Sequence, residues 1–178
     1  MGADKAFLEF EGRTLLARAL DVARSVTAEV NIIGDPTKFA AFAPVVEDIF
    51  PSCGPLGGIH AALRSSSADL NLVLAVDMPF VTVDLLGYLV ERARSSSATV
   101  TVPHCGGNQP LCAVYRRSFA DSAQLALNQG RYKIDALFAI ESTQVIREDE
   151  LKGKGFSAEM FRNLNTPEEL AQARSLRG

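Results

Sequence analysis

The chain has 178 residues, the size of one ordinary domain, so we expect a single hydrophobic core and one domain over residues 1–178. Apolar residues make up 47% and charged residues 22%, which is the balance of a globular protein. The net charge of −3 lacks the excess of Lys and Arg that nucleic acids and anionic membranes attract, so neither is an expected partner.

The cysteines indicate the compartment. Cys53, Cys105 and Cys112 are odd in number and show no Cys-x-x-Cys spacing, so neither a disulfide framework nor a zinc knuckle is predicted. Reduced thiols in a cytoplasmic location fit best.

The longest apolar runs are too short to cross a bilayer, and the first residues show no basic region followed by an apolar one, so no signal peptide is predicted.

Short strand-like runs alternate with longer helical patterns, which is typical of an α/β sheet with crossover helices. In chain order we expect a small extended segment at 6–10, a helix over 15–23, a strand at 29–33, a short helix at 36–42, a strand at 45–49, a helix at 59–65, a strand at 70–76, a helix at 83–94, strands at 98–102 and 111–115, helices at 119–127 and 133–139, an extended piece at 143–146 and a last helix from Thr166.

The run 70–76 is the most hydrophobic predicted strand, and we expect it to be a central parallel strand buried on both faces. Asp77 follows it directly. In open α/β sheets ligands bind beyond the carboxyl ends of the strands, and a carboxylate there suits Mg²⁺. Asp77 could instead only cap the turn before the next helix. The rigid turn that Pro79 makes just beyond the carboxylate favours a functional role.

A run rich in glycine and proline precedes the helix predicted at 59–65. Glycines let the backbone approach a ligand closely, and a helix N-terminus attracts phosphate, so the run predicts a phosphate or nucleotide contact. Asp48, at the end of the preceding strand, points to the same edge of the sheet. The residues of this run are Gly54, Pro55, Leu56, Gly57 and Gly58.

Asn163, Asn165 and Lys5 are three further polar residues considered for the functional site. Asn163 and Asn165 stand at i and i+2 in an extended segment, so they face the same way and offer paired donors and acceptors, unless they serve only as turn and capping residues. Lys5 precedes the first extended segment, and spacing alone gives it no role. His60 is expected to be a packing or surface residue rather than a base.

Five motifs, taken in order, resemble the molybdenum cofactor guanylyltransferase (MobA) family over essentially the whole chain. They are Met-Gly-x-Asp-Lys at 1–5, Gly-Pro-Leu-Gly-Gly-Ile at 54–59, Asp-Met-Pro-Phe at 77–80, Gln-Pro-Leu-Cys-Ala-Val-Tyr at 109–115 and Asn-Leu-Asn-Thr-Pro-Glu-Glu-Leu at 163–170.

The resemblance implies a Rossmann-like, three-layer α/β/α nucleotidyltransferase with a mostly parallel sheet. It implies transfer of GMP from GTP to molybdopterin, with release of pyrophosphate. Lys5 would contact the GTP phosphates, Asp48 the nucleotide, and Asp77 both Mg²⁺ and GTP, while Asn163 and Asn165 would face the pterin. The recipients of the product would be molybdoenzymes or their chaperones.

The chain departs from the family pattern at its start. The resemblance implies a buried strand and a Leu-Ala-Gly-Gly-x-Ser-x-Arg loop directly ahead of Met-Gly-x-Asp-Lys, and this sequence holds neither. We therefore expect the first strand of the sheet and the glycine-rich loop to be missing, and Met1 to be an internal methionine of the motif. Loss of that strand predicts unpaired backbone groups on its neighbours.

Two rival interpretations stay open. One is a nucleotidyltransferase of the same architecture that uses CTP or another phosphate acceptor, since the missing loop would hold most of the residues that read the base. The other is a non-catalytic nucleotide-binding descendant. The joint presence of Lys5, Asp48 and Asp77 argues against the second, because a decayed site need not keep all three.

Overall fold

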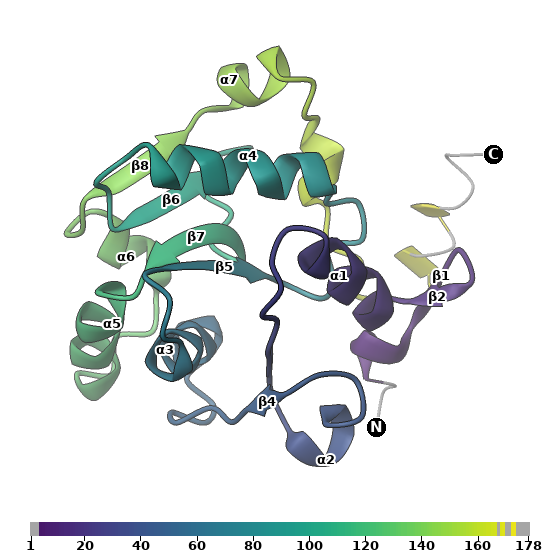
Figure 1. Cartoon of the computed structure of the whole chain (residues 1–178), viewed down its shortest axis with the longest axis horizontal. Helices are drawn as coiled ribbons and strands as arrows, with labels where there is room; N and C mark the ends of the chain where they lie inside the picture. Colours follow the sequence, from purple (N-terminus) through teal and green to yellow (C-terminus); the bar gives the residue numbers. More distant parts are fainter. Residues whose placement is uncertain (1–3, 167, 170–171, 174–178) are drawn as a thin grey trace.

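The computed structural model describes residues 4–166, 168–169 and 172–173 of the chain. Helices and strands alternate along this part, and none of its helices is long and apolar enough to cross a membrane. The elements, shown in Figure 1, are β1 (Glu9–Phe10), β2 (Arg13–Thr14), α1 (Leu15–Arg24), β3 (Ile32–Ile33), α2 (Pro36–Phe39), β4 (Val45–Val46), α3 (Pro55–Ser65), β5 (Leu70–Leu74), α4 (Val83–Arg94), β6 (Val100–Pro103), β7 (Cys112–Arg116), α5 (Phe119–Asn128), α6 (Ile134–Phe138), β8 (Thr143–Ile146) and α7 (Glu148–Gly153), with single 3₁₀ turns at Lys5–Phe7 and Ala158–Phe161.

The largest sheet has four strands in the order β5-β7-β6-β8. β6 and β8 are parallel, and β7 is antiparallel to both β5 and β6, so three of the four strands run in one direction. The predicted mixed α/β architecture is confirmed. Because β5, β6 and β8 share a direction, their carboxyl ends lie at one edge of the sheet.

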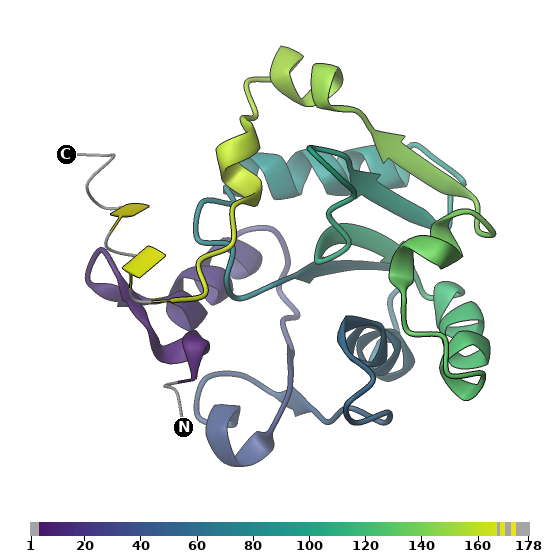
Figure 2. The ribbon, with the colours of Figure 1, turned by 180° about the vertical axis from the view of Figure 1, so that it is seen from behind.

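Helices cover both faces of this sheet (Figures 1 and 2). Alternate residues of β7 supply the two cores, as the two-residue period of a strand requires. Ala113 and Tyr115 pack among buried residues of α3, α5 and α6, whereas Cys112 and Val114 pack among buried residues of α4. The sequence folds into three layers because β6 and β7 have buried residues on both faces of the sheet.

The prediction that the run 70–76 is a central parallel strand is wrong in its pairing. β5 is an edge strand of the four-stranded sheet and is antiparallel to its one ladder partner in the described part, β7. All five of its residues are half-buried, although the run is strongly apolar. The physical reason lies on its other side, where no described strand pairs with it.

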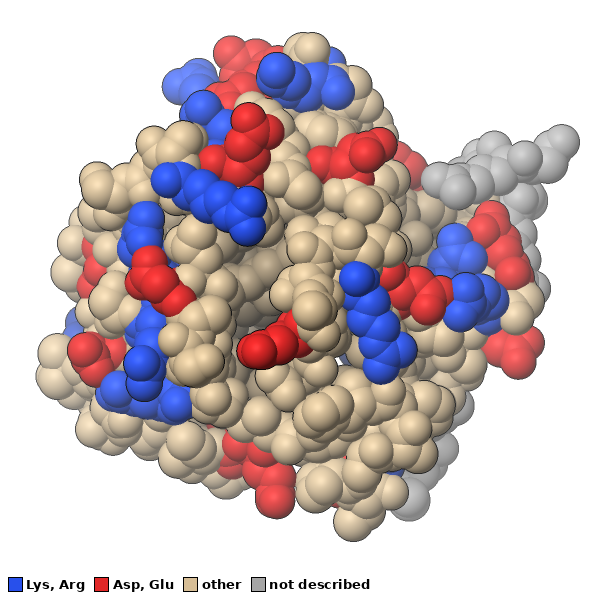
Figure 3. Space-filling model, viewed as in Figure 1, with Lys and Arg blue, Asp and Glu red and all other residues tan. Residues whose placement is uncertain are grey.

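A cleft of about 910 Å³ lies along that free edge of β5. Its opposite wall includes β3, which forms a separate two-stranded parallel sheet with β4. The space-filling view shows a hollow near the centre of the face seen in Figure 1, with an acidic side chain at its lower rim and mostly uncharged atoms elsewhere around it (Figure 3). Within the described part no strand pairs with the edge of β5 that faces this cleft.

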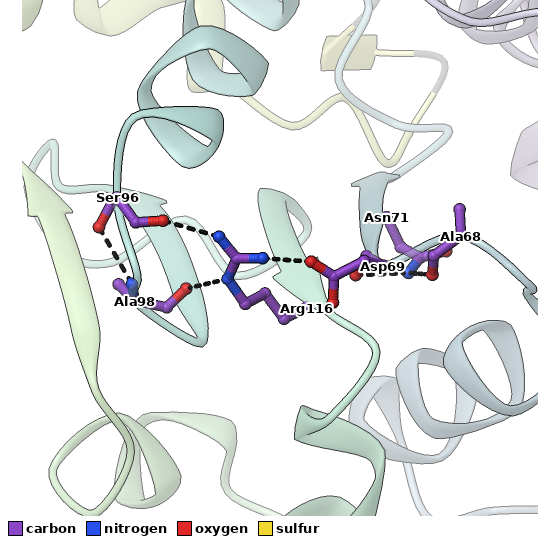
Figure 4. A network of polar contacts seen from close by, with 6 residues as sticks. All are labelled: Ala68, Asp69, Asn71, Ser96, Ala98 and Arg116. Atoms are coloured by element: carbon purple, nitrogen blue, oxygen red, sulfur yellow. Dashed lines mark hydrogen bonds and ion pairs between the residues drawn. The ribbon is translucent and has the colours of Figure 1, made fainter.

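At the opposite edge of the sheet from Asp77, Arg116 ties three segments together (Figure 4). Its guanidinium pairs with the carboxylate of Asp69 and donates to the carbonyl oxygens of Ser96 at 2.7 Å and Ala98 at 3.1 Å. One cation thus joins the end of β7 to the start of β5 and to the loop before β6. Burial of such a cation is offset only when its donors are satisfied in this way.

Most element types are as predicted, with some shifted boundaries. α3 begins at Pro55, four residues before the predicted start at Ile59, because proline suits the first position of a helix. The short helix at Glu148–Gly153 was not predicted. At the helix predicted from Thr166, Glu169 and Thr166 exchange the two hydrogen bonds of a capping box, while Pro167 lies outside the described residues.

Candidate functional site

Lys5 and Asp77 form the centre of the candidate site. The Lys5 ammonium donates to Oδ2 of Asp77 at 2.5 Å across 72 residues of sequence. The Asp77 side chain is only 8% exposed, whereas that of Lys5 is 45% exposed, so a buried carboxylate is presented to a solvent-accessible cation. Asp77 follows the carboxyl end of β5, where the sequence predicted a ligand site.

The segment of the two asparagines reaches the same place. Oδ1 of Asn165 accepts from the Lys5 ammonium at 3.3 Å, and the backbone N–H of Leu164 donates to the carbonyl oxygen of Asp77 at 2.8 Å. Leu164 is fully buried between two exposed asparagines, so Asn163 and Asn165 share the outer face of the segment as predicted. Residues from the two ends of the chain therefore meet at the end of β5.

The capping box of the last helix holds Asn165 in place. The carboxylate of Glu169 accepts the backbone N–H of Asn165 at 2.6 Å and that of Thr166 at 3.3 Å. The sequence predicted a helix from Thr166 but not the backbone hydrogen bond from Leu164 to Asp77. The apolar residue between two asparagines was the available signal, since its burial requires a neighbouring core.

Asp48 and the glycine-rich run form a second group. The Asp48 carboxylate accepts the Phe50 backbone N–H at 2.8 Å and lies against the first turn of α3. A Cβ on Gly57 would come within 2.9 Å of Oδ2 of Asp48 and of the Phe50 carbonyl oxygen, so only glycine allows this approach. The negative charge sits where the helix dipole is positive.

The glycine-rich run is mostly helix rather than loop, which corrects the prediction. Gly54 alone precedes α3, and its φ of 69° is the left-handed conformation that glycine adopts freely. Pro55, Leu56 and Gly57 make the first turn of the helix, with Leu56 and Gly57 buried. Asp48, Gly54 and Pro55 line the cleft beside β5. No hydrogen bond in the described part joins this group to the Lys5–Asp77 pair.

His60 is a packing residue, as predicted. Its side chain is 1% exposed, its ring meets the ring of Phe50 edge-on, and its Nε2 contacts Gln124 at 3.0 Å. Nδ1 is buried without a hydrogen-bond partner in the described part. Burial lowers the pKa of His60 below its ordinary value, because the charged imidazolium is poorly solvated there.

The donor set at the site suits a hard cation held mainly by a substrate. Across the described residues no three His, Cys, Asp or Glu side chains gather to form a complete metal site. Asp77 offers a buried carboxylate whose Oδ2 already binds one positive charge, the Lys5 ammonium. Mg²⁺ commonly takes one or two carboxylates and completes its shell with phosphates and water, so a single carboxylate fits it.

A three-layer α/β fold with a buried carboxylate at the carboxyl edge of its sheet is an arrangement typical of nucleotide-binding enzymes. Comparison with known proteins agrees, since the family model described as "MobA-like NTP transferase domain" matches residues 1–145. The chain belongs to the MobA-like NTP transferase family, and it is a nucleotidyltransferase.

Individual relatives and solved structures show which members of the family the chain resembles. The chain is 33% identical over 177 residues to a "Probable molybdenum cofactor guanylyltransferase" of Pelotomaculum thermopropionicum, covering 98% of this chain and 85% of that protein. The crystal structure of "Molybdopterin-guanine dinucleotide biosynthesis protein A" from Archaeoglobus fulgidus matches with a TM-score of 0.83 and 25% identity, over 99% of this chain and 91% of that one. The 2-C-methyl-D-erythritol 4-phosphate cytidylyltransferase of Thermus thermophilus matches with a TM-score of 0.69 at 21% identity, over 97% and 93%, and shares the fold alone.

Proposed function

We propose that the protein transfers GMP from GTP to molybdenum-bound molybdopterin, forming the molybdopterin guanine dinucleotide cofactor and pyrophosphate. The observation that carries the proposal is the cluster of Lys5, Asp77 and Asn165 at the carboxyl end of β5. Support also comes from relatives named for this activity. The three reduced thiols favour a cytoplasmic location.

In the proposed reaction an oxygen of the molybdopterin phosphate attacks the α-phosphorus of GTP in line. The bond from that phosphorus to the bridging oxygen breaks, and pyrophosphate leaves with the electron pair. Such a transfer needs positioning and charge neutralisation rather than a protein nucleophile. No covalent enzyme intermediate is required.

Each residue of the site has a role in this scheme. Lys5 is exposed enough to turn from Asp77 to the triphosphate, where its charge offsets that of the phosphates. Asp77 would then hold Mg²⁺, which supplies charge neutralisation at the reacting phosphate when bound. Asn163 and Asn165 would donate to the pterin, and Asp48 with the first turn of α3 would contact the nucleotide.

The direct test is pyrophosphate release from GTP in the presence of molybdenum-bound molybdopterin and Mg²⁺. We expect GTP to support turnover and CTP to support much less. The Asp77→Asn variant keeps the shape of the side chain but loses its charge, and we expect its turnover to fall roughly 10²–10³-fold, as for other removed electrostatic contacts. Unchanged turnover in this variant contradicts the role of Asp77.

The rival nucleotidyltransferase is tested by the same assay. The fold does not choose the base, since a cytidylyltransferase shares it. Faster pyrophosphate release from CTP than from GTP assigns the chain to that alternative. Binding of GTP with no release of pyrophosphate under any acceptor favours the non-catalytic alternative.

A further inference from the structure

The connection between β6 and β7 begins at the same edge of the sheet as Asp77. Leu72 of β5 and Thr101 of β6 both lie opposite Val114 of β7, so they stand at the same level along their strands. There β5 and β6 are two interstrand spacings apart, about 10 Å. Both strands run in one direction, and His104 follows Thr101 by three residues as Asp77 follows Leu72 by five. His104 therefore lies at the carboxyl edge, on the other side of β7 from β5.

The β6–β7 loop, residues 104–109, is held in one shape by its own hydrogen bonds. His104 and Asn108 pair across it as an isolated β-bridge. The Cys105 N–H donates to the Gly107 carbonyl oxygen at 2.9 Å, and the side-chain amide of Gln109 donates to the carbonyl oxygens of Cys105 at 3.1 Å and Gly107 at 3.3 Å. These bonds fix the backbone from which the His104 side chain projects.

The segment that follows β8 holds the loop from outside. The Ile146 carbonyl oxygen accepts the His104 N–H at 2.9 Å, and the Glu148 carboxylate accepts the Gly106 N–H. The pKa of Glu148 is lowered, first by its bond with the Lys152 ammonium and further by the Gly106 N–H and the nearby His104, so this carboxylate stays ionised. A loop anchored at both of these points presents its side chains in a fixed direction, as a binding site requires.

The His104 ring is the last member of a chain of three polar side chains. The Asn108 amide nitrogen donates to Oδ1 of Asp135, in the first turn of α6, at 2.9 Å, and Nδ1 of His104 lies 3.0 Å from Oδ1 of Asn108. A carboxylate only accepts, so the amide turns its NH₂ group to Asp135 and its oxygen to the ring. Nδ1 therefore carries the proton. In a neutral imidazole the other nitrogen, Nε2, is then a hydrogen-bond acceptor.

This acceptor is available to a ligand. His104 is exposed, and among the described residues Nε2 has no hydrogen-bond partner. An unprotonated nitrogen cannot donate to a phosphate or a carboxylate, whereas it can accept from an N–H or O–H group. The direction fixed by Asn108 and Asp135 therefore selects a ligand that brings a donor to this point of the sheet edge.

The position of His104 relates it to the acceptor substrate rather than to the nucleotide. Asp48, Gly54 and Pro55 line the cleft on the β3 side of β5, and in the proposed function this side contacts the nucleotide. His104 lies in the other direction from Asp77, across β7. In-line transfer requires the attacking oxygen to approach from the side opposite the leaving pyrophosphate, so the acceptor needs a place outside the nucleotide site.

We propose that His104 binds the acceptor substrate, with Nε2 accepting a hydrogen bond from a ring N–H of the pterin. Asn108 and Asp135 are positioning residues, because they act by fixing the tautomer of the ring. The inference rests on the proposed function, since it names a contact of the acceptor in that reaction. A pterin carries N–H donors on its rings, and a phosphate dianion carries none, so His104 recognises the heterocycle rather than the phosphate.

The first test is NMR of the imidazole nitrogens in the ¹⁵N-labelled chain at about pH 8, where imidazole is ordinarily neutral. His60 is the other histidine and serves as the internal reference. We expect the proton of His104 on Nδ1 in the free protein and a mixture of both tautomers in Asp135→Ala. Molybdenum-bound molybdopterin should shift the Nε2 signal of His104 and leave His60 unchanged, whereas GTP with Mg²⁺ should leave His104 unchanged.

A matched pair of substitutions at His104 separates the roles of its two nitrogens. His104→Asn keeps an amide nitrogen in the place of Nδ1, and so the bond to Asn108, but leaves nothing in the place of Nε2. In His104→Gln the longer side chain brings an amide oxygen to the place of Nε2, so an acceptor remains there. We expect His104→Asn to raise KM for molybdopterin roughly tenfold with KM for GTP unchanged, and His104→Gln to raise it less than about threefold.

Several results overturn the proposal. One is a proton on Nε2 in the free protein, and another is a His104 signal that stays in place when molybdopterin binds. Equal KM values for molybdopterin in the wild-type protein and His104→Asn also exclude the contact, and a raised KM for GTP alone assigns His104 to the nucleotide. If His104→Asn does not fold, as thermal unfolding would show, the ring signals of the wild-type protein decide.

Failure of the proposed function gives a different result. In that case the wild-type protein itself releases no pyrophosphate from GTP and molybdopterin. Failure of the present inference leaves that release intact and shows only in the ring signals and in the unchanged KM of His104→Asn.

Discussion

The two edges of β5 differ in how they pair. One edge pairs with β7 over five residues and is tied at its start by Arg116. The other faces a cleft, and in the part of the chain that the structure describes no strand pairs with its backbone groups at Leu72 and Leu74. The same five residues serve both edges, so the difference comes from pairing rather than composition.

This difference separates stability from function. The β7 side holds Tyr115 and Phe119, two of the largest fully buried side chains, whereas the strand residues Ile32 and Ile33 on the cleft side are only half-buried. Lys5, Asp77 and Asp48 all lie at or beside the cleft side. Functional groups commonly occupy the less stable parts of a fold, because binding needs accessible and adjustable positions. The predictions below test that separation.

The largest contrast in unfolding free energy is expected between the β7 side and the cleft side of β5. Phe119→Ala removes a fully buried ring that packs on Tyr115 and Phe138, and it should cost about 3–5 kcal/mol of unfolding free energy. Ile32→Ala, on the half-buried cleft side, should cost about 1 kcal/mol. Urea denaturation measures both, and equal losses would contradict the contrast.

The next largest loss of stability is expected on replacing Arg116, the cation at the end of β7. Arg116→Leu leaves the Ser96 and Ala98 carbonyls and the Asp69 carboxylate without their donor, and it should cost about 2–3 kcal/mol. Arg162→Leu breaks only an exposed pair with Glu159 and should cost less than about 1 kcal/mol. Thermal unfolding of both variants checks this, and a similar Tm for the two would refute the assigned role of Arg116.

A smaller effect is expected at the first turn of α3. Gly57→Ala puts a methyl group 2.9 Å from the Asp48 carboxylate and the Phe50 carbonyl, so it should destabilise the protein by about 1–2 kcal/mol. It should also weaken nucleotide binding, because Asp48 must shift. Gly87→Ala adds the same methyl group to α4 in open space and should stabilise by about 0.5–1 kcal/mol. If both substitutions stabilise the protein, the close approach at Gly57 does not affect its stability.

The smallest effect is a pH dependence from His60. Its pKa is lowered by burial, so the unfolded chain binds a proton more readily than the folded one. Stability from this group is full above about pH 7 and falls as the pH drops through about 6.5, the ordinary value for histidine. We expect Tm to fall between about pH 7.5 and 5.5, and to fall less in His60→Gln. An identical pH profile for the two proteins would exclude this cause.

Much of the fold and part of the site could be predicted from the sequence. The helix at 15–23, the helix at 83–94 and the extended piece at 143–146 are local patterns, and the structure confirms them with small shifts of boundary. Asp77 was placed correctly at the carboxyl end of a strand. The partners of that carboxylate could not be predicted by spacing, because Lys5 and Asn165 come from opposite ends of the chain and meet only after folding.

By itself the sequence determined the identity of the elements, since hydrophobic periodicity, caps and turn residues act over a few neighbouring positions. Only the tertiary structure decided that the most hydrophobic strand lies at an edge, that β7 runs against its neighbours, and that a lone lysine pairs with a buried aspartate. The reason is that strand pairing and ion pairing depend on which distant segments come together. An apolar run such as 70–76 has the same sequence pattern whether one of its edges or both are paired.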